Sequence, residues 1–340
     1  MSKILVTGAA GFIGSQLLHK LIVDGNEVVG IDNYSYGHDD NLLFEDGDYS
    51  KYVVKGDIRD KDVLVELFDK YHFDYVYNIA GIAPLPDCQS NPAEAISVNV
   101  GGFANILEFS RKYGVKTVVQ ASTNAMYENE TEFPTTEDFK SKPTLIYPNT
   151  KYCAEIFAKS FCDTYDMNVC CVRFANVYGP HVDCLRKQPP FVGYLIRELY
   201  YNRTPIFHST GNQARDYVYV DDLVNLLIAV QSCKGFDTVN CSTNTSYSVR
   251  GIYDIAKMIM GKNIEAEYVD SSNYWKKYPE LYEGAYSIKQ SILDHEVNKF
   301  SRCDNTYAKE KYGWVPKVDM YEGMKNMIEY QVELFDKLNK

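Results

Sequence analysis

Tyr147 and Lys151 stand four residues apart at the beginning of a predicted helix. Side chains at this spacing lie on one face of a helix, one turn apart. A phenol titrates near pH ~10 and is a poor base at neutral pH, but a nearby ammonium favours the phenolate. A tyrosine tuned in this way can take a proton from a substrate hydroxyl and later return it. Because Tyr and Lys also meet at this spacing on exposed helix faces, the pair needs support from the rest of the chain.

A glycine-rich turn near the N-terminus gives that support. The apolar run at residues 4–6 predicts a buried strand, and helical periodicity follows the turn. Gly8 permits a tight turn, Gly11 lets the backbone approach a pyrophosphate, and Gly14 lets the helix pack closely on the strand. The start of the helix supplies free amide groups for phosphates. An ordinary strand-to-helix turn is the alternative, but the whole unit predicts dinucleotide binding.

An acidic residue follows the second predicted strand. Asp32 lies about as far beyond Gly14 as a ribose-binding carboxylate does in dinucleotide-binding proteins. A carboxylate accepts hydrogen bonds from ribose hydroxyls and repels a 2′-phosphate, so Asp32 favours NAD over NADP. The alternative is a turn residue before Asn33. After the third strand, Asp57 and Ile58 are placed to border an adenine.

Strands and helices alternate through the first half of the chain. The predicted strands comprise residues 3–7, 27–31, 52–55, 75–79, 115–120 and 169–174. This alternation is typical of a parallel sheet on which ligands bind beyond the carboxyl ends of the strands. Ala80 and Gly81 follow the fourth strand and suit a backbone that lies under a cofactor, and Thr123 follows the fifth. We predict an α/β fold: a Rossmann-type doubly wound parallel sheet with a smaller, interleaved α/β substrate-binding domain.

Composition limits the classes of partner. The chain has 340 residues and a formal net charge of -11, which argues against binding to nucleic acid or to an anionic membrane. No apolar run reaches the ~18 residues of a membrane span, and the N-terminus enters a strand without a signal peptide. The nine cysteines include no Cys-x-x-Cys pair, and we read them as reduced and buried. These features predict a cytoplasmic protein, and we expect no metal site.

Together, these motifs resemble the extended short-chain dehydrogenase/reductases, in the branch of nucleotide-sugar epimerases and dehydratases. The matching pieces follow the family's order over almost the whole chain. They are Thr7-Gly8-x-x-Gly11-x-x-Gly14, Asp32, residues 56–60, Asn99, Ser122-Thr123, Tyr147-x-x-x-Lys151, residues 173–180, residues 215–222 and Tyr312-Gly313-Trp314-x-Pro316. Each motif alone is modest, whereas this order and spacing together are specific.

The resemblance implies a role for each matching residue. Tyr147 would be the acid/base, Lys151 would bind the nicotinamide ribose and tune the tyrosine, and Thr123 would hydrogen-bond the same substrate oxygen. NAD would be bound by Gly8, Gly11, Phe12, Ile13, Gly14, Asp32, Asn33, Asp57, Ile58, Ala80, Gly81, Asn99, Tyr147 and Lys151. The nucleotide-diphosphate sugar would contact Thr123, Asn124, Asn176 and Arg215. An arginine suits a bidentate diphosphate contact; the alternative for Arg215 is an ordinary salt bridge, for example with Asp222.

The resemblance also bears on the reaction. Members of this branch begin when the tyrosine takes the proton of the hydroxyl at sugar carbon 4 while the hydride passes to NAD. Relatives that dehydrate carry an Asp-Glu pair directly after the threonine, whereas this chain has Asn124 and Ala125, neither of which is an acid or a base. Inversion at carbon 4 is the chemistry that remains. The resemblance therefore implies an NAD-dependent nucleotide-sugar 4-epimerase that acts through a transient 4-keto-sugar, with Tyr147 as the acid/base.

Three other functions stay open from the sequence. A nucleotide-sugar 4-dehydrogenase or ketoreductase would use the same residues and release its product with a net redox change. A nucleotide-sugar 4,6-dehydratase is disfavoured by Asn124 and Ala125. A non-catalytic NAD-sensing protein on the same fold would have no need of the intact Tyr147, Lys151 and Thr123.

The chain also departs from the family pattern. Asn78 stands where the family usually has histidine, and the segment at residues 84–88 is unusual and lies near the expected sugar pocket. The C-terminal Arg-Pro-Gly-Asp segment is missing, and only Lys289 or Arg302 could substitute for its arginine.

The resemblance further implies a homodimer. The predicted helices at residues 93–113 and 147–165 correspond to helices that pair across a two-fold axis in many relatives. Their apolar surface would come from Phe103, Ile106, Leu107, Ile156 and Phe157. Within the subunit we expect an NAD-binding Rossmann domain of residues 1–175 with returns near 205–242. Residues 176–204 and 243–340 would form the nucleotide-sugar-binding domain.

Overall fold

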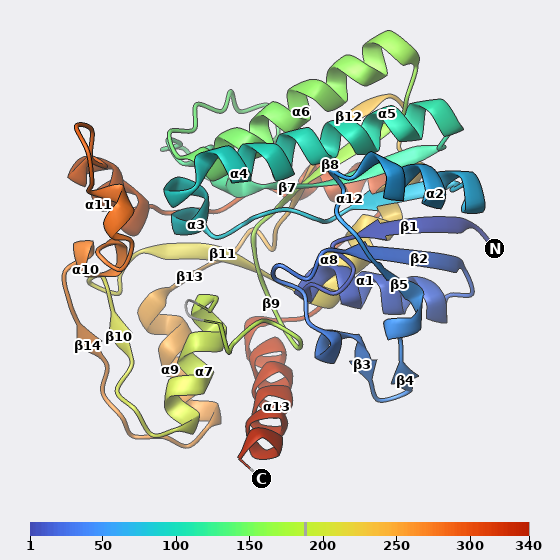
Figure 1. Ribbon diagram of the computed structural model, residues 1–340. Helices are drawn as coiled ribbons and strands as arrows, with labels where there is room; N and C mark the ends of the chain where they lie inside the picture. Colours follow the sequence, from blue (N-terminus) through green and yellow to red (C-terminus); the bar gives the residue numbers. More distant parts are fainter. Residues whose placement is uncertain (187–188, 340) are drawn as a thin grey trace.

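One sheet of seven parallel strands organises the computed structural model, which describes residues 1–186 and 189–339 (Figure 1). The strand order is β12-β8-β7-β6-β1-β2-β5, so the chain winds outward from β1 first to one side and then to the other. This arrangement confirms the predicted doubly wound α/β fold. The strands are β1 (Lys3–Thr7), β2 (Glu27–Asp32), β5 (Val53–Lys55), β6 (Tyr75–Asn78), β7 (Thr117–Thr123), β8 (Val169–Phe174) and β12 (Phe236–Cys241).

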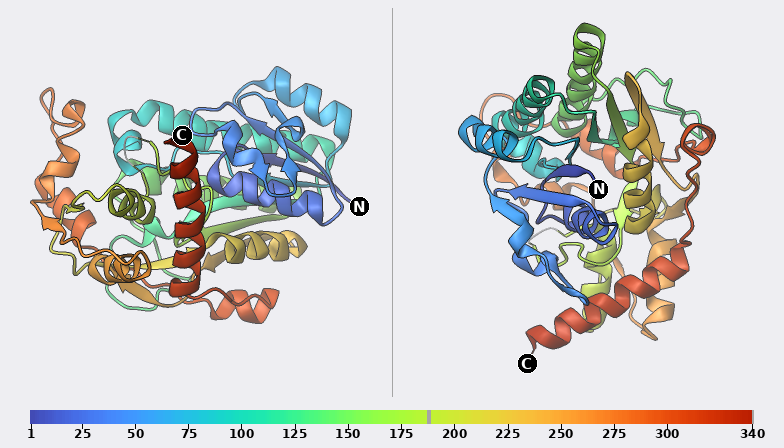
Figure 2. Two further views of the ribbon diagram at one scale, coloured as in Figure 1. Left: turned by 90° about the horizontal axis from the view of Figure 1, so that it is seen from below. Right: turned by 90° about the vertical axis from the view of Figure 1, so that its right-hand side faces the viewer.

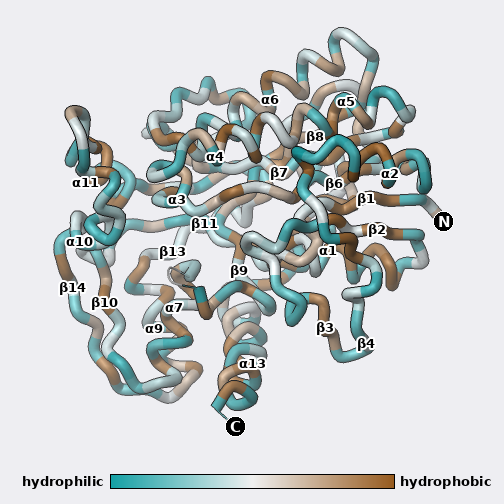
Figure 3. The backbone as a smooth tube through the Cα atoms, in the orientation of Figure 1, coloured by the Kyte–Doolittle hydropathy of each residue, from teal (hydrophilic) through white to brown (hydrophobic). Residues whose placement is uncertain are grey.

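Successive side chains of the central strands enter two different cores. Ile4 and Val6 of β1 belong to the core on one face, and Leu5 between them belongs to the core on the other. Because neighbouring side chains of a strand point to opposite faces, a sheet covered on both sides needs a continuous apolar run. Figure 3 shows hydrophobic stretches in the middle of the molecule and hydrophilic stretches on outer loops.

Helices form a layer on each face of this sheet, as the two views of Figure 2 show. The helices that share a core with Ile4 are α1 (Phe12–Val23), α8 (Val220–Ala229) and α12 (Thr306–Tyr312). Those that share a core with Leu5 are α2 (Lys61–Tyr71), α5 (Phe103–Tyr113) and α6 (Ile146–Tyr165). We expected α12 in the nucleotide-sugar-binding domain, because it lies within residues 243–340. Instead, this helix packs against strand β12 of the central sheet and against helix α8.

A second, smaller lobe lies beside the carboxyl ends of the strands (Figure 1). Its strands are β9 (Asn176–Tyr178), β10 (Ile206–Phe207), β11 (Ala214–Tyr219), β13 (Ser246–Ser248) and β14 (Glu267–Tyr268). Its helices include α7 (Phe191–Tyr200), α9 (Val249–Ile259) and α13 (Met320–Leu338), which share a third hydrophobic core. Residues 272–298 of this lobe form α10 (Ser272–Trp275), the 3₁₀ turn η6 (Pro279–Leu281) and α11 (Gln290–Asn298).

The helix expected at residues 93–113 is interrupted. It consists of α4 (Pro92–Ile96), a π-helical turn η3 (Ser97–Gly102) and α5. Adjacent glycines at 101 and 102 weaken the regular helix, and a Cβ on Gly102 would lie 2.5 Å from the Cδ1 atom of Ile58. Such turns occur often at functional sites, and this one carries Asn99.

No helix in the described ranges is both long enough and apolar enough to cross a membrane. The nine cysteines form no disulfide, and eight of them are buried, as expected; Cys153 is partly exposed.

Candidate active site

A cavity of about 330 Å³, which we call the cofactor groove, lies beyond the carboxyl ends of β1, β2 and β6. Eleven of the predicted cofactor-binding residues line it: Gly8, Gly11, Phe12, Ile13, Gly14, Asp32, Asn33, Asp57, Ile58, Ala80 and Gly81. They come from four separate strand ends, which the parallel sheet brings to one edge.

The first loop requires glycine at two points. Gly8 has a φ of +67°, in the left-handed region that favours glycine. A Cβ on Gly14 would lie 1.9 Å from the carbonyl oxygen of Gly8, so a side chain there would push α1 away from β1. Gly11 occupies the N-cap position of α1 and has no side chain to bond the first-turn N–H groups. These groups are therefore available beside the groove for phosphate oxygens.

Asp32 ends β2 and lines the groove opposite β6. Its Oδ2 accepts from the Ala10 N–H at 2.9 Å, and its Oδ1 accepts from the Tyr34 N–H at 2.7 Å. Burial raises the pKa of Asp32, and these backbone hydrogen bonds act in the opposite direction. A carboxylate fixed here can accept hydrogen bonds from ribose hydroxyls and would repel a 2′-phosphate. The site therefore fits NAD and not NADP.

Tyr147 and Thr123 meet where α6 begins beside the end of β7. Thr123 Oγ1 accepts from the Ala125 N–H at 3.1 Å, which leaves its own hydrogen for the Tyr147 oxygen. Burial raises the pKa of Tyr147 to about 12, and the hydrogen bond from Thr123 opposes that shift. The pKa is therefore raised, not lowered as expected from Lys151, because desolvation of the phenol is the largest effect.

Lys151 lies below the floor of the groove. Its Nζ donates to the carbonyl oxygen of Ala121 at 2.9 Å, and burial lowers its pKa to about 8. A Cβ on Gly81 would lie 3.2 Å from this Nζ, so the ammonium reaches the groove only because residue 81 is glycine. A donor at this depth is placed to bind a ribose hydroxyl of a ligand above Gly81.

Asn99 does not line the groove, although the resemblance assigned it to the cofactor. Its Nδ2 donates to the carbonyl oxygen of Ile82 at 2.9 Å and to Thr150 Oγ1 at 3.0 Å. Its Oδ1 accepts from the Ile82 N–H at 2.8 Å. These bonds use both donors of the amide and one acceptor site of its oxygen, so Asn99 joins the groove residue Ile82 to α6.

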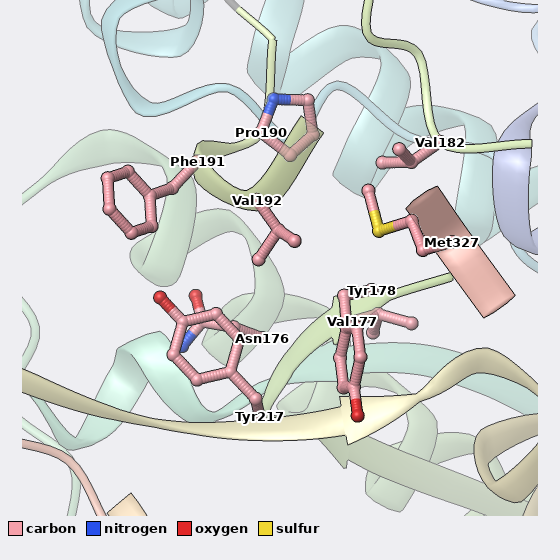
Figure 4. Close-up of a pocket in the computed structure, with 9 residues that line it drawn as sticks. All are labelled: Asn176, Val177, Tyr178, Val182, Pro190, Phe191, Val192, Tyr217 and Met327. Carbon is pink, nitrogen blue, oxygen red and sulfur yellow. The ribbon is translucent and has the colours of Figure 1, made fainter. Parts of the chain in front are cut away.

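A second cavity of about 150 Å³, the inner cavity, adjoins the groove and contains the predicted Asn176 (Figure 4). Its walls are Asn176, Val177, Tyr178, Val182, Pro190, Phe191, Val192, Tyr217 and Met327, of which Val177, Val182 and Pro190 also line the groove. Asn176 Nδ2 donates to the carbonyl oxygen of Asp216 at 3.0 Å. A molecule in the groove can therefore extend toward the second lobe.

Arg215 is a partly buried cation bound by carbonyl groups. Its Nη2 donates to the carbonyl oxygen of Glu296 at 2.8 Å, and its Nη1 to that of Ala214 at 3.3 Å. The suggested salt bridge with Asp222 is wrong, because that carboxylate accepts from the N–H groups of Lys317 and Val318. Burial lowers the pKa of Arg215. Its hydrogen bonds go to neutral carbonyl groups, and the charge of Glu296 only partly offsets the effect of burial, so an anionic ligand would find a cation here.

The other predicted substrate residues have different surroundings. Asn124 is buried, and its Nδ2 lies 3.8 Å from the Sγ of Cys303. Lys289 is exposed at the start of α11. The Nε atom of Arg302 is buried and has no hydrogen-bond partner among the described residues. Of the two cations considered for the missing C-terminal motif, Arg302 is therefore the one with a buried donor that no described residue satisfies.

Sequence reasoning missed part of the groove lining. The missed residues are Ser35, Tyr36, Gly37, Glu94, Val98, Asp183 and Arg186. They lie in irregular segments or on the far side of short helices, where no periodic pattern marks a ligand-facing side chain.

Comparison with known proteins agrees with this geometry. Residues 4–241 match the model of the NAD dependent epimerase/dehydratase family. The UDP-glucose 4-epimerase of Mycolicibacterium smegmatis is 30% identical over 330 residues, which are 96% of this chain and 98% of that protein. The UDP-glucuronate 4-epimerase of Thermodesulfobacterium geofontis is 27% identical over a match that covers 98% of this chain and 97% of that protein.

Solved structures give the same result. The UDP-glucose 4-epimerase of Thermotoga maritima, determined with UDP-glucose, superposes with a TM-score of 0.86 at 30% identity. The match covers 99% of this chain and 100% of that one. With the family model and these relatives beside the glycine loop, Asp32 and the Tyr147–Lys151 pair, the chain belongs to the NAD-dependent epimerase/dehydratase family, and its cofactor is NAD.

Proposed function

We propose that this protein is a 4-epimerase of nucleotide-diphosphate sugars that keeps one NAD bound through the reaction. The observation that carries the proposal is the placement of Thr123, at the end of β7, beside Tyr147 and Lys151 at the start of α6, with Lys151 beneath Gly81 of the groove. A phenol, its hydroxyl partner and a cation meet there next to a site that fits NAD. Proton transfer at a sugar hydroxyl is the chemistry that this set performs.

In the proposed mechanism, Tyr147 takes the proton of the hydroxyl at sugar carbon 4 and later returns it. NAD, which the glycine loop and Asp32 would hold, would supply the acceptor and donor of hydride for carbon 4. Thr123 is oriented by the Ala125 N–H and donates to the phenol oxygen, which stabilises the phenolate. Burial raises the pKa of the phenol, which makes its phenolate the stronger base toward the hydroxyl at carbon 4.

Two features support a nucleotide diphosphate as the carrier of the sugar. Arg215 donates to two carbonyl groups, and Asn176 lines the inner cavity opposite Tyr217, which is two residues beyond Arg215 on β11. A guanidinium is well suited to two diphosphate oxygens. The relatives named above act on UDP-glucose or UDP-glucuronate, so UDP-sugars are the first candidates.

The alternatives have less support. A 4,6-dehydratase needs an acid and a base after Thr123, but Asn124 carries an amide beside Cys303 and Ala125 uses its N–H on Thr123. A 4-dehydrogenase or ketoreductase would use the same Tyr147 and differ only in releasing the oxidised or reduced product. The need for stoichiometric added NAD distinguishes that activity from epimerisation.

Incubation with a panel of UDP-sugars in deuterated water, without added NAD, tests the proposal by proton NMR. We expect a product inverted at carbon 4 that contains no deuterium, because the hydride returns without exchange. Deuterium at carbon 5 would contradict the proposal and indicate proton chemistry next to the ketone. Turnover only with stoichiometric NAD, together with NADH absorbance, would indicate a dehydrogenase instead.

We also propose a homodimer, on a smaller surface than the sequence suggested. Phe103, Ile106 and Leu107 belong to the subunit's own core, because the apolar face of α5 packs on the sheet. Ile156 and Phe157 on α6 remain exposed, at 51% and 45%. Light scattering at micromolar concentration is expected to give the mass of two chains for the wild type and of one chain for Phe157→Glu. A monomeric wild type would remove this proposal.

A further inference from the structure

Three side chains far apart in the sequence meet at one carboxylate. Tyr36 donates its hydroxyl to Asp87 Oδ2 at 2.8 Å, and Tyr278 donates to Asp87 Oδ1 at 3.0 Å. Tyr36 follows β2, Asp87 lies in helix α3 (Leu85–Ser90), and Tyr278 lies between α10 and η6 of the second lobe. Hydrogen bonds to an ionised carboxylate are among the stronger ones in proteins, so this set can hold the three segments together.

The Tyr36–Asp87 bond crosses the cofactor groove. β2 and β6 are the two neighbours of β1 in the sheet, and the glycine loop that follows β1 lines the groove between them. One wall contains Asp32 and Tyr36 from the β2 side, and the other contains Ala80 and the residues up to Ala83 on the β6 side. Asp87 lies one helical turn beyond Ala83. A bond from Tyr36 to Asp87 therefore joins the two walls over the space between them.

Tyr278 extends this closure to the second lobe. The segment around it has a small core of its own, made by Trp275, Leu281 and Leu293, and Leu85 of α3 packs against that core. The second lobe thus contacts α3 both through Leu85 and through the carboxylate. Figure 1 shows α3 beside α4, at the end of the helical layer of α5 and α6 that faces α10 and α11.

We propose that Tyr36, Asp87 and Tyr278 form a clasp that closes the cofactor groove and slows the release of NAD. The inference rests on the proposed function, in which one NAD must stay bound through both hydride transfers. NAD that leaves over this part of the groove has to break the Tyr36–Asp87 bond first. The unusual segment at residues 84–88 then has a role, because it supplies the carboxylate.

Release of NAD from the loaded protein tests the clasp directly. The protein is saturated with radiolabelled NAD and chased with a large excess of unlabelled NAD, and the label that remains bound is followed by rapid gel filtration. The variants are Tyr36→Phe, Tyr278→Phe and Asp87→Asn. Tyr49→Phe is the matched control, because Tyr49 donates to Asp46 at 2.9 Å in an equivalent bond that is exposed and away from the groove.

We expect Tyr36→Phe and Asp87→Asn to raise the NAD dissociation rate by about tenfold to a hundredfold, the range for loss of a hydrogen bond to a charged group. The effect of the double variant should be smaller than the product of the two single effects, because both changes act on the Tyr36–Asp87 bond. Tyr278→Phe should raise the rate by a smaller factor, and Tyr49→Phe should leave it unchanged.

A dissociation rate for Tyr36→Phe within twofold of the wild type overturns the clasp, as does an equal increase in Tyr49→Phe. An altered KM for the nucleotide sugar with an unchanged NAD dissociation rate also overturns it, because these residues would then act on the substrate. The tyrosine variants remove one oxygen each and decide the question even where Asp87→Asn lowers the melting temperature. Faster NAD release in a protein that epimerises none of the sugars would uphold the clasp and reject the proposed function.

Discussion

Replacing Tyr147 with phenylalanine is expected to lower kcat by about 10²- to 10⁴-fold, the contribution typical of a general acid/base. The change removes one oxygen, which bonds to Thr123 and lies at the start of α6 beside the groove. The glycine loop and Asp32, which bind the dinucleotide, lie on other strands. NAD content, measured from absorbance after denaturation, should therefore stay at the wild-type value while NMR turnover is lost.

Tyr165→Phe is the control for this variant. Tyr165 ends the same helix and is 49% exposed, so loss of its hydroxyl should leave turnover unchanged. Turnover of Tyr147→Phe close to that of the wild type would reject the catalytic assignment. A combined loss of turnover and NAD would show instead that the phenol helps to hold the cofactor.

A second large effect is expected from the buried ion pair behind the site. Arg173 Nε lies 3.0 Å from Glu155 Oε1, and its Nη2 lies 2.7 Å from Oε2; the side chains are 7% and 5% exposed. Ser122 Oγ donates to the same Oε1 at 2.6 Å. Glu155 is one turn beyond Lys151 on α6, so this carboxylate ties the catalytic helix to the end of β7. Arg173→Met would leave the Glu155 carboxylate buried without its cationic partner.

Arg173→Met is expected to reduce the free energy of unfolding by about 3–5 kcal/mol, measured by urea denaturation. The double variant Arg173→Met with Glu155→Gln should recover part of this loss, because the uncompensated charge is then gone. Lys159→Met breaks an exposed pair with Asp163 on the same helix and should have little effect. A loss in Arg173→Met no larger than in Lys159→Met would contradict the role assigned to the buried pair.

Much of the nucleotide-binding half could be predicted because its signals are local. The spacing of Gly8, Gly11 and Gly14 follows from one tight turn, and Asp32 follows from the end of one strand. Tyr147 and Lys151 are predicted by the pitch of a single helix. Strands buried on both faces also have an unmistakable apolar run. Each of these features depends on neighbouring residues only, so the sequence is sufficient to locate it.

The predictions that failed depend on which way a helix faces or on how deeply a group is buried. Phe103, Ile106 and Leu107 form an apolar stripe that fits a dimer interface and the subunit core equally well. In the structure, this stripe packs against the central sheet. The pKa of Tyr147 is raised rather than lowered, because desolvation depends on all the atoms around the phenol. The sequence shows that Lys151 lies one helical turn from Tyr147, but it does not show that the carbonyl oxygen of Ala121 accepts the hydrogen bond of Lys151.

The sequence by itself determined the doubly wound fold, the dinucleotide loop and the tyrosine–lysine pair. Only the tertiary structure decided which distant side chains meet. Tyr36, Asp87 and Tyr278 come together from three segments, and Arg215 meets the carbonyl group of Glu296 across the second lobe. Local patterns follow from the geometry of one helix or strand, whereas such contacts depend on how whole elements pack, and that packing is a property of the entire chain.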